Sequence, residues 1–257
     1  MTSHAEVVSS DVSRAERALH RRAAWACSAA VEAGVPGNFR AWEQAGVLAV
    51  LATDPALSFL STVSGVTAET VRAAIDLANM PIWGDVRPTV VVPASLSEAA
   101  MRPLRAAGLA QAEDRLLAVK RLEASPVVPG LTIVDADSDG RFVDTLLAGY
   151  EVDGAVAAFI RAEHQLPMMH RFLAVQRGTP FGAAAMTIHD DVAVLGGAST
   201  LRAHRGRGAQ SGLLHHRLRA AAEAGCVLAV ATARPGSVSA SNLRRAGFLL
   251  EPRVVWR

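Results

Sequence analysis

The sequence predicts a protein of the α/β class, of the α+β type, with two related domains in tandem. Helix-period and strand-period segments alternate in a similar order in both halves of the 257 residues. A short segment with prolines and a glycine, Ala124–Gly130, separates the halves. The stretches Leu104–Leu109 and Leu243–Phe248 resemble each other, and each precedes a strand. We expect one domain over residues 1–123 and one over residues 131–257, each with a mixed, mostly antiparallel sheet flanked by helices.

The first half begins with one long helix, because apolar residues recur at helical spacing over Val12–Ala33 and glycine and proline follow. Thr53-Asp54-Pro55 separates two apolar runs, which predicts a hairpin. Gly108 is expected to end a later helix. After the long helix, the expected elements are hairpin strands at Gly46–Ala52 and Leu57–Val63, a helix at Thr67–Asn79, a strand at Thr89–Val92, a helix at Ser97–Ala107 and a strand at Arg115–Leu122.

The second half repeats this layout with two helices at its start. Short connections at Arg177–Pro180 and His189–Asp191 predict two successive hairpins. The expected elements are helices at Gly140–Gly149 and Gly154–His164, strands at Phe172–Gln176, Gly182–His189 and Val192–Leu201, a helix at Ala209–Ala224, a strand at Val227–Thr232, a helix at Ser239–Ala246 and a strand at Leu249–Trp256.

Composition excludes several classes of protein. With 51% hydrophobic and 19% charged residues, the chain can form a full core, and its apolar runs are much shorter than the roughly 20 residues of a membrane span. Its N-terminus lacks the apolar core of a secretory signal, and Cys27 and Cys226 lie far apart, so we expect a reducing cytoplasm. A net charge of +2 does not favour nucleic acid as a partner, although Ser199–Ala222 contains five arginines and no acidic residue.

The segment that carries the chemistry is Ser199–Gln210, between a strand and a helix. A glycine-rich turn into a helix leaves several backbone N–H groups free to bind an anion, and the helix dipole supports them. Glycines at 206 and 208 let a phosphate approach the backbone, while Arg205 and Arg207 add positive charge. The pattern predicts a pyrophosphate site, and the alternative is a surface turn with solvated arginines.

This segment resembles the GCN5-related N-acetyltransferase (GNAT) family, whose signature Arg/Gln-x-x-Gly-x-Gly/Ala follows its fourth strand. Arg205–Ala209 fits the first five positions, and Gln210 departs at the last. Gly196-Gly197 is similar to the bulged fourth strand that admits the pantetheine arm, and Ser239–Phe248 to the final helix with its Gly-Phe end. The resemblance covers about residues 137–257.

The first half resembles the family by element order alone, and it lacks the signature between Val63 and Thr67. The chain is thus similar to tandem GNAT proteins of high-GC bacteria, in which one domain keeps the cofactor site. The resemblance implies acetyl-CoA as acyl donor, direct transfer to the amine of a small molecule and no metal. It implies a cofactor site at Ser199, Thr200, Leu201, Arg205, Gly206, Arg207, Gly208, Ala209, Gln210 and Asn242.

The residues that usually catalyse the transfer are missing from their usual places. The family often uses a glutamate on the fourth strand as base, but Val192–Leu201 holds no acidic residue. Its frequent acid is a tyrosine at the position of Leu243, and the chain has one tyrosine, Tyr150. The candidates are Glu163 as base and Ser239 as acid, although such a serine is more often a helix cap. Other possible bases are His164, His170, His189, Asp190 and Asp191.

Two alternatives stay open at this point. The missing acid and base favour a non-catalytic acyl-CoA-binding or regulatory protein. A GNAT-fold transferase that takes its acyl group from an aminoacyl-tRNA would also account for the arginines, and tRNA would be a partner in that case alone. The acceptor pocket would form from Arg141–His170, and the sequence leaves open whether the protein is a monomer or a homodimer.

Overall fold

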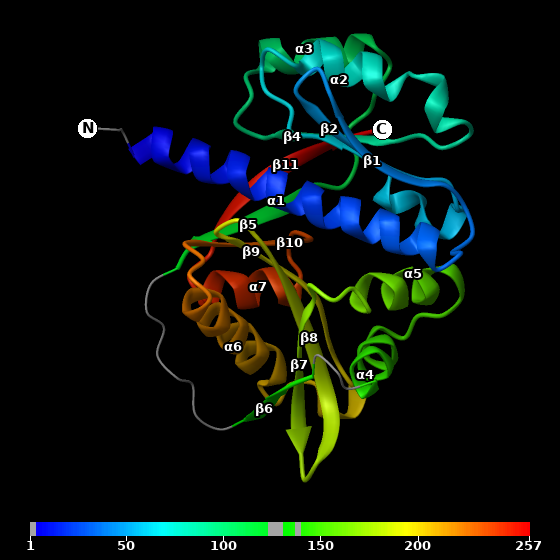
Figure 1. Ribbon diagram of the computed structural model, residues 1–257. Coiled ribbons are helices and arrows are strands. Elements are labelled where there is room, and N and C mark those ends of the chain that lie inside the picture. Colours follow the sequence, from blue (N-terminus) through cyan, green and yellow to red (C-terminus); the bar gives the residue numbers. More distant parts are fainter. Residues whose placement is uncertain (1–3, 123–130, 137–139) are drawn as a thin grey trace.

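The computed structural model describes residues 4–122, 131–136 and 140–257, so the expected linker Ala124–Gly130 lies outside the described residues. Within them, the strands form one mixed sheet in the order β1-β2-β3-β4-β11-β5-β10-β9-β8-β7-β6 (Figure 1). Two neighbouring pairs, β3 with β4 and β9 with β10, are parallel, and the other pairs are antiparallel. The predicted α/β class with a mostly antiparallel sheet is confirmed.

The first half departs from the prediction at one hairpin. Of the expected strand Leu57–Val63, Thr62 and Val63 do form a strand that pairs antiparallel with the strand before it. Leu57–Leu60 instead belong to a 3-10 helix, which begins where Asp54 accepts a hydrogen bond from the Ala56 amide (2.8 Å). Positive φ angles at Ala45 and Gly46 instead make the turn of a hairpin that had not been predicted. The elements are α1 (His4–Glu32), β1 (Phe39–Gln44), β2 (Val47–Ala52), η1 (Pro55–Leu60), β3 (Thr62–Ser64), α2 (Val71–Ala78), η2 (Pro81–Trp83), β4 (Thr89–Pro93), α3 (Glu98–Ala106) and β5 (Arg115–Arg121).

The second half contains every helix and strand that was predicted, with small shifts at their ends. It adds one short edge strand, β6, that the sequence did not predict. The elements are β6 (Thr132–Asp135), α4 (Arg141–Tyr150), α5 (Gly154–His164), β7 (His170–Gln176), β8 (Thr179–His189), β9 (Val192–Thr200), η3 (Arg202–His204), α6 (Ala209–Glu223), β10 (Leu228–Ala233), α7 (Val238–Arg245) and β11 (Leu249–Trp256).

The last strands of the two halves are exchanged. Strand β11 pairs with β4 of the first half, β5 pairs with β10 of the second half, and β5 and β11 pair with each other. They run side by side through the middle of the molecule in Figure 1. The repeated helix–glycine–strand units of the sequence are therefore α3–β5 and α7–β11, at matching places in the sheet. The division at residues 123 and 131 stays a prediction.

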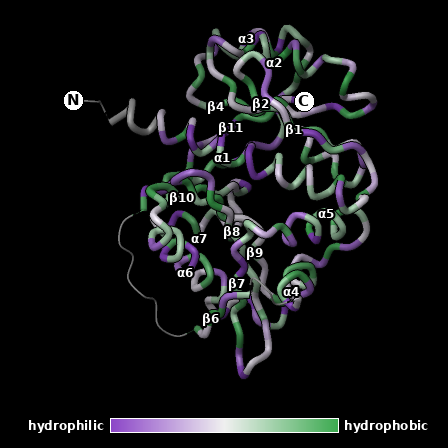
Figure 2. The backbone as a smooth tube through the Cα atoms, viewed as in Figure 1, coloured by the Kyte–Doolittle hydropathy of each residue, from purple (hydrophilic) through white to green (hydrophobic). Residues whose placement is uncertain are grey.

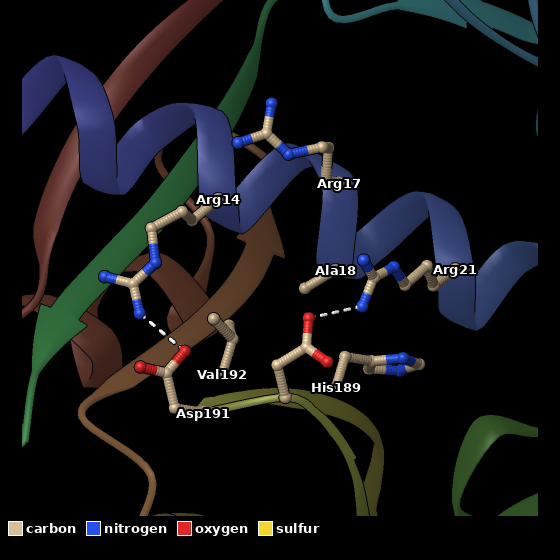
Figure 3. A pocket seen from close by; sticks show the side chains of 8 residues that line it. Arg14, Arg17, Ala18, Arg21, His189, Asp191 and Val192 are labelled. Atoms are coloured by element: carbon tan, nitrogen blue, oxygen red, sulfur yellow. Dashed lines mark hydrogen bonds and ion pairs between the residues drawn. The ribbon is translucent and has the colours of Figure 1, made fainter.

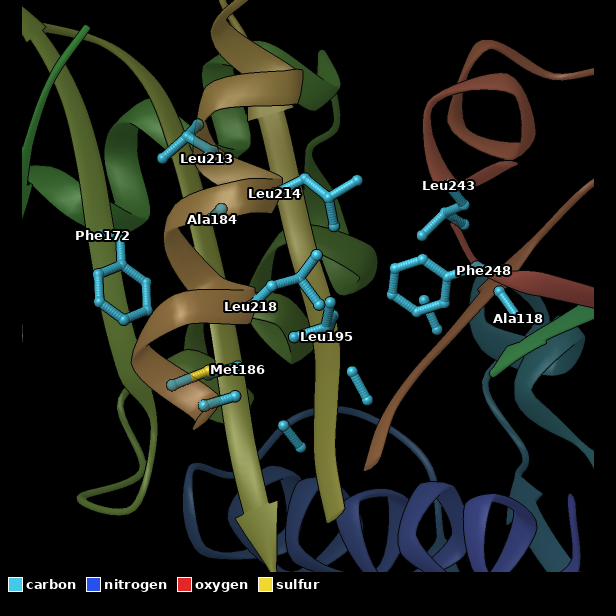
Figure 4. Packing of buried hydrophobic residues seen from close by; sticks show 14 of the residues in the cluster. Ala118, Phe172, Ala184, Met186, Leu195, Leu213, Leu214, Leu218, Leu243 and Phe248 are labelled. Atoms are coloured by element: carbon cyan, nitrogen blue, oxygen red, sulfur yellow. The ribbon is translucent and has the colours of Figure 1, made fainter. Parts of the chain in front are cut away.

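The two faces of the sheet around β7–β10 are covered by different helices. Helices α6 and α7 pack on one face, where Leu213, Leu214 and Leu218 meet Phe172 and Met186 (Figure 4). Figure 2 shows hydrophilic and hydrophobic residues interspersed along the α6 tube, as expected for a helix with one buried side. Helices α1, α4 and α5 lie on the other face.

Helix α1 packs against elements of both halves. Its Arg14 and Arg21 form ion pairs with Asp191 (2.6 Å) and Asp190 (2.5 Å), while Arg17 points away from both (Figure 3). The two aspartates form the predicted β8–β9 turn, where Asp190 has a φ of 55°. Among the described helices, none has the length and apolarity needed to cross a membrane. Through α1, the first half reaches the face on which the site described below is built.

Candidate functional site

Strands β9 and β10 separate from each other partway along their length. They pair only from Val192 to Val194 on β9, although β9 continues to Thr200 and β10 to Ala233. The register with β8 shifts between Ala184 and Ala185, so Gly197 is the extra residue of a bulge, with a φ of 62°. The predicted bulge is confirmed, and the unpaired stretch of β9 and β10 beyond Val194 forms an opening in the hydrogen bonding of the sheet.

A side chain from a helix packs directly against each of the two glycines of this bulge. A Cβ at Gly196 would lie 2.9–3.0 Å from the guanidinium atoms of Arg22 on α1. A Cβ at Gly197 would overlap Nε2 of His164 on α5. The groups that lie close to these glycines are thus side chains of the helices on the α1–α5 face.

Arg22 and Glu163 form a buried ion pair beside the bulge. Arg22 Nε lies 2.8 Å from a Glu163 carboxylate oxygen, and the side chains are 8% and 15% exposed. Arg22 also donates to the carbonyl of Val194 (3.3 Å). Burial alone would raise the pKa of Glu163, but the charge of Arg22 and its hydrogen bond outweigh burial and hold that pKa below its usual value. Glu163, the expected base, is therefore an ionised carboxylate that is paired with the guanidinium of Arg22.

His164 follows Glu163 and is buried. Its Nδ1 lies 2.8 Å from the carbonyl oxygen of Ile160, which can only accept, so Nδ1 carries the hydrogen. Nε2 then bears the lone pair, and no group in the described part of the chain hydrogen-bonds to it. Burial lowers the pKa of His164, and Arg22 and Arg171 act in the same direction, against Glu163. The imidazole is consequently neutral at pH 7.

Two further polar side chains lie at the bulge. The hydroxyl of Tyr150 on α4 accepts a hydrogen bond from the Ala198 amide (2.9 Å). Arg217 on α6 is buried and donates to the carbonyls of Leu213 (3.2 Å) and Ala185 (3.1 Å). Burial lowers the pKa of Arg217 to about 10, which leaves it charged. Sequence reasoning missed Arg217 and Arg22, because helical spacing does not tell which strand residue an arginine meets.

The turn into α6 has the form that the sequence predicted. Gly206 and Gly208 have φ angles of 76° and 82°, and a Cβ at either would meet open space. Gly208 is the N-cap of α6, and no side chain of the described residues caps it. The first amides of the helix are therefore available to an anion. Arg205 bonds to the Thr200 and Gly149 carbonyls (3.2 and 2.9 Å), and Arg207 is exposed.

Residues Ser199 to Gln210 lie together at this end of β9. Ser199 is buried and donates to the Leu146 carbonyl (2.9 Å), while the buried hydroxyl of Thr200 has no partner in the described structure. Gln210, the departure from the signature, donates to the Ala198 carbonyl (3.4 Å) on β9. Its side chain thus links α6 to the strand beside the opening.

The residues expected on the final helix lie on α7. Asn242 is buried and accepts a hydrogen bond from Arg245 (2.5 Å), and Ser239 is exposed in the first turn. The helix cap is Ser237, whose hydroxyl accepts from the Ala240 amide (3.1 Å). Leu243 faces the core next to Phe248 (Figure 4). Within the described ranges, no three metal-binding side chains come together.

The part of the chain that carries this site matches a known protein family. A sequence model of the acetyltransferase (GNAT) family matches residues 136–248, from the start of α4 through the splayed strands to α7. The second half of the chain belongs to the GNAT family. The opened β9–β10 pair and the uncapped turn into α6 are thus parts of a GNAT domain. No protein of curated function matches the sequence.

Solved structures resemble the chain over both halves. A GCN5-related N-acetyltransferase from Kribbella flavida is 20% identical with a TM-score of 0.62, over 91% of this chain and 95% of its own. A functionally unknown conserved protein from Staphylococcus epidermidis is 13% identical (TM-score 0.56, 86% and 94% covered). A GNAT-family acetyltransferase from Colwellia psychrerythraea is 15% identical (TM-score 0.52, 82% and 80%). At these identities the likeness concerns the fold, and it extends beyond the GNAT match into the first half.

Proposed function

We propose that the protein is an acetyl-CoA-dependent N-acetyltransferase that transfers the acetyl group directly to the amine of a small molecule. The observation that carries this proposal is the uncapped turn Gly206–Gly208 at the start of α6, beside the opening between β9 and β10. The turn offers backbone amides and Arg207 to the phosphates of CoA, and the opening offers a path for the pantetheine arm. Cytoplasmic location and the small-molecule acceptor are part of this proposal.

The residues of the site would have distinct roles. Ser199, Thr200, Leu201 and Arg205–Ala209 would contact the cofactor, with Arg205 holding the turn against Gly149 and Thr200. Gln210 would hold α6 to β9, and Asn242 would face the cofactor from α7. Bound acetyl-CoA supplies an activated thioester, so the protein's contribution is to orient the two substrates and to move protons.

A binding measurement tests the turn directly. Gly208→Glu places a carboxylate where the phosphates would bind, and we expect it to weaken acetyl-CoA binding at least about 100-fold by calorimetry. The matched control is Gly225→Glu at the other end of α6, because Gly225 has a similar φ of 84° and equally open surroundings. The control should bind acetyl-CoA as the wild type does.

Three other outcomes would count against the proposal. Equal binding by wild type and Gly208→Glu would remove the turn from the cofactor site. Binding of acetyl-CoA without transfer to any amine of a broad panel would favour a non-catalytic acyl-CoA-binding protein. Transfer that requires aminoacylated tRNA and declines steeply with salt would replace acetyl-CoA as the donor.

A further inference from the structure

Strand β9 has no acidic side chain, yet an imidazole occupies the side-chain position of one of its residues. Because an added Cβ at Gly197 would overlap Nε2 of His164, this nitrogen lies where the side chain of residue 197 would begin. Gly197 comes three positions after Val194, the last β9 residue that pairs with β10. Helix α5 therefore places a basic nitrogen at the bulge, beside the opening.

The hydrogen bonds of His164 leave this nitrogen without a protein partner. Nδ1 donates to the Ile160 carbonyl at 2.8 Å, which fixes the tautomer. Nε2 is buried, and none of the described residues donates to it. Buried acceptors in proteins are nearly always hydrogen-bonded, so Nε2 is able to accept a hydrogen bond from a ligand that comes close to the bulge. An amine can donate such a bond.

The charged groups around the imidazole favour its neutral form. The groups that face it are Arg22 from α1, Glu163 from its own helix, Arg171 from β7, the ring of Phe142 from α4 (centroids 6.0 Å apart) and the backbone of Gly197 from β9. Arg22 binds Glu163 at 2.8 Å, so this carboxylate is held by a cation and not by the imidazole alone. The lone pair of Nε2 is consequently available at neutral pH.

We propose that His164 is the general base of the acetyl transfer, and that Arg22 and Glu163 are positioning residues that act through it. This proposal rests on the proposed function. The acceptor nitrogen gives one proton to Nε2 as it attacks the thioester carbonyl carbon. A C–N bond forms, the C–S bond breaks, and the imidazolium returns the proton to the leaving thiolate. The products are an amide and the CoA thiol, and the imidazole is neutral again.

Part of the site would then come from the first half of the chain. Arg22 lies on α1, 141 positions before its partner Glu163. Its guanidinium fits against β9 because residue 196 is a glycine, as Nε2 fits because residue 197 is one. Because neither glycine has a side chain, the guanidinium of Arg22 and the imidazole of His164 can both lie against the bulge.

The test compares pH profiles of transfer. Wild type, His164→Ala and His164→Gln are assayed from pH 5 to 9 with saturating acetyl-CoA and a panel of spermidine, tyramine, lysine and glycinamide. We expect the variants to lower kcat about 100-fold, with unchanged acetyl-CoA binding. The ratio of wild-type to variant rates should approach one as the pH falls and the imidazole is protonated, because the titration of the amine cancels in this ratio. Added imidazole should restore part of the activity of His164→Ala.

A second histidine provides the matched control. His215 on α6 makes the same bond from Nδ1 to a carbonyl four residues earlier, that of Ser211, at 2.8 Å. His215→Ala should therefore keep the wild-type rate and pH profile.

Failure of this proposal can be told apart from failure of the proposed function. Wild-type transfer with a constant variant ratio, or variants as fast as the wild type, would overturn the role of His164 alone. A wild type that binds acetyl-CoA but transfers to no amine would overturn both. His164→Gln keeps much of the side-chain volume, so a folded, acetyl-CoA-binding His164→Gln separates loss of the base from loss of structure.

Discussion

Both halves contain a strand, a loop, a helix and a second strand that runs parallel to the first: β3, α2 and β4 in the first half, and β9, α6 and β10 in the second. The loop before the helix differs between them. In the first half, the loop between β3 and α2 bonds to itself: the Thr67 amide donates to Thr70 (2.8 Å) and the Thr67 hydroxyl to Glu69 (2.6 Å). In the second half, the loop before α6 has two glycines in the left-handed region, and no side chain of the described structure caps the helix. The composition of the loop therefore distinguishes the two halves, and the strand arrangement does not.

The largest expected difference between the halves concerns a glycine near each parallel pair. Gly197→Ala would overlap the rigid ring of His164, and Gly65→Ala in the first half would meet only the Leu48 side chain, 3.0 Å away. Both glycines have positive φ angles, so both variants carry the same backbone strain. In urea unfolding, we expect Gly197→Ala to lose about 2–4 kcal/mol and Gly65→Ala about 1–2 kcal/mol.

A double variant would sharpen this comparison. Removing the imidazole with His164→Ala should recover much of the loss of Gly197→Ala, because the overlapping atoms are gone. Equal losses for the two single variants, or strictly additive effects in the double variant, would contradict the contact between His164 and Gly197.

The strand that precedes the parallel pair also differs between the halves, and this predicts a pH effect. Strand β2 ends at Ala52, whose backbone bonds to the Ser61 hydroxyl, whereas β8 ends at His189. Burial lowers the pKa of His189 to about 4 from 6.5, and Arg22 and Arg21 contribute. Since the unfolded chain binds the proton more tightly, stability present above pH 6.5 is lost as the pH falls toward 4.

The wild type should accordingly lose about 1–2 kcal/mol through His189 between pH 7 and pH 5. The measurement is urea unfolding of wild type and His189→Gln at both pH values, with the difference between the proteins assigned to this residue. The same pH dependence in both proteins would show that the pKa of His189 is the same in the folded and the unfolded chain.

The smallest expected changes in stability come from variants in the loops before α2 and α6. Thr70→Val removes the acceptor of the Thr67 amide, and we expect a loss of about 1 kcal/mol with unchanged acetyl-CoA affinity. Thr200→Val in the second half removes a buried hydroxyl without a partner among the described residues, so its stability should stay the same or rise by up to about 1 kcal/mol. Calorimetry with acetyl-CoA checks the first variant, and weaker binding by Thr70→Val would place a ligand in the first half as well.

Sequence reasoning predicted those parts of the molecule that local chemistry decides. The turn into α6 depends on Gly206 and Gly208, and the end of helix α3 on Gly108, whose φ is 81°, and both have the predicted form. Strand β1 was missed because Arg40 and Glu43 interrupt its apolar pattern, and β6 because it has four residues. These are edge regions, where few apolar contacts are needed.

The rest of the site depends on contacts between distant segments. The bulge was predicted from Gly196-Gly197, but the two side chains that approach it were not. Arg22 has the spacing of any helical arginine, and only the packing of α1 on the second half brings it to Glu163. The exchange of β5 and β11 is equally hidden, because the order of elements along a chain does not tell which strand edge each one meets.

The exchanged strands bear on how the protein is made. When the first half leaves the ribosome, β4 has β3 on one side but lacks β11 on the other until residues 249–256 have been synthesised, and β5 has no partner until β10 and β11 follow. Unpaired strand edges favour aggregation, so the nascent chain should depend on chaperones that hold such edges apart. A protease cut between the halves should accordingly yield two fragments that bind each other rather than two independently stable domains.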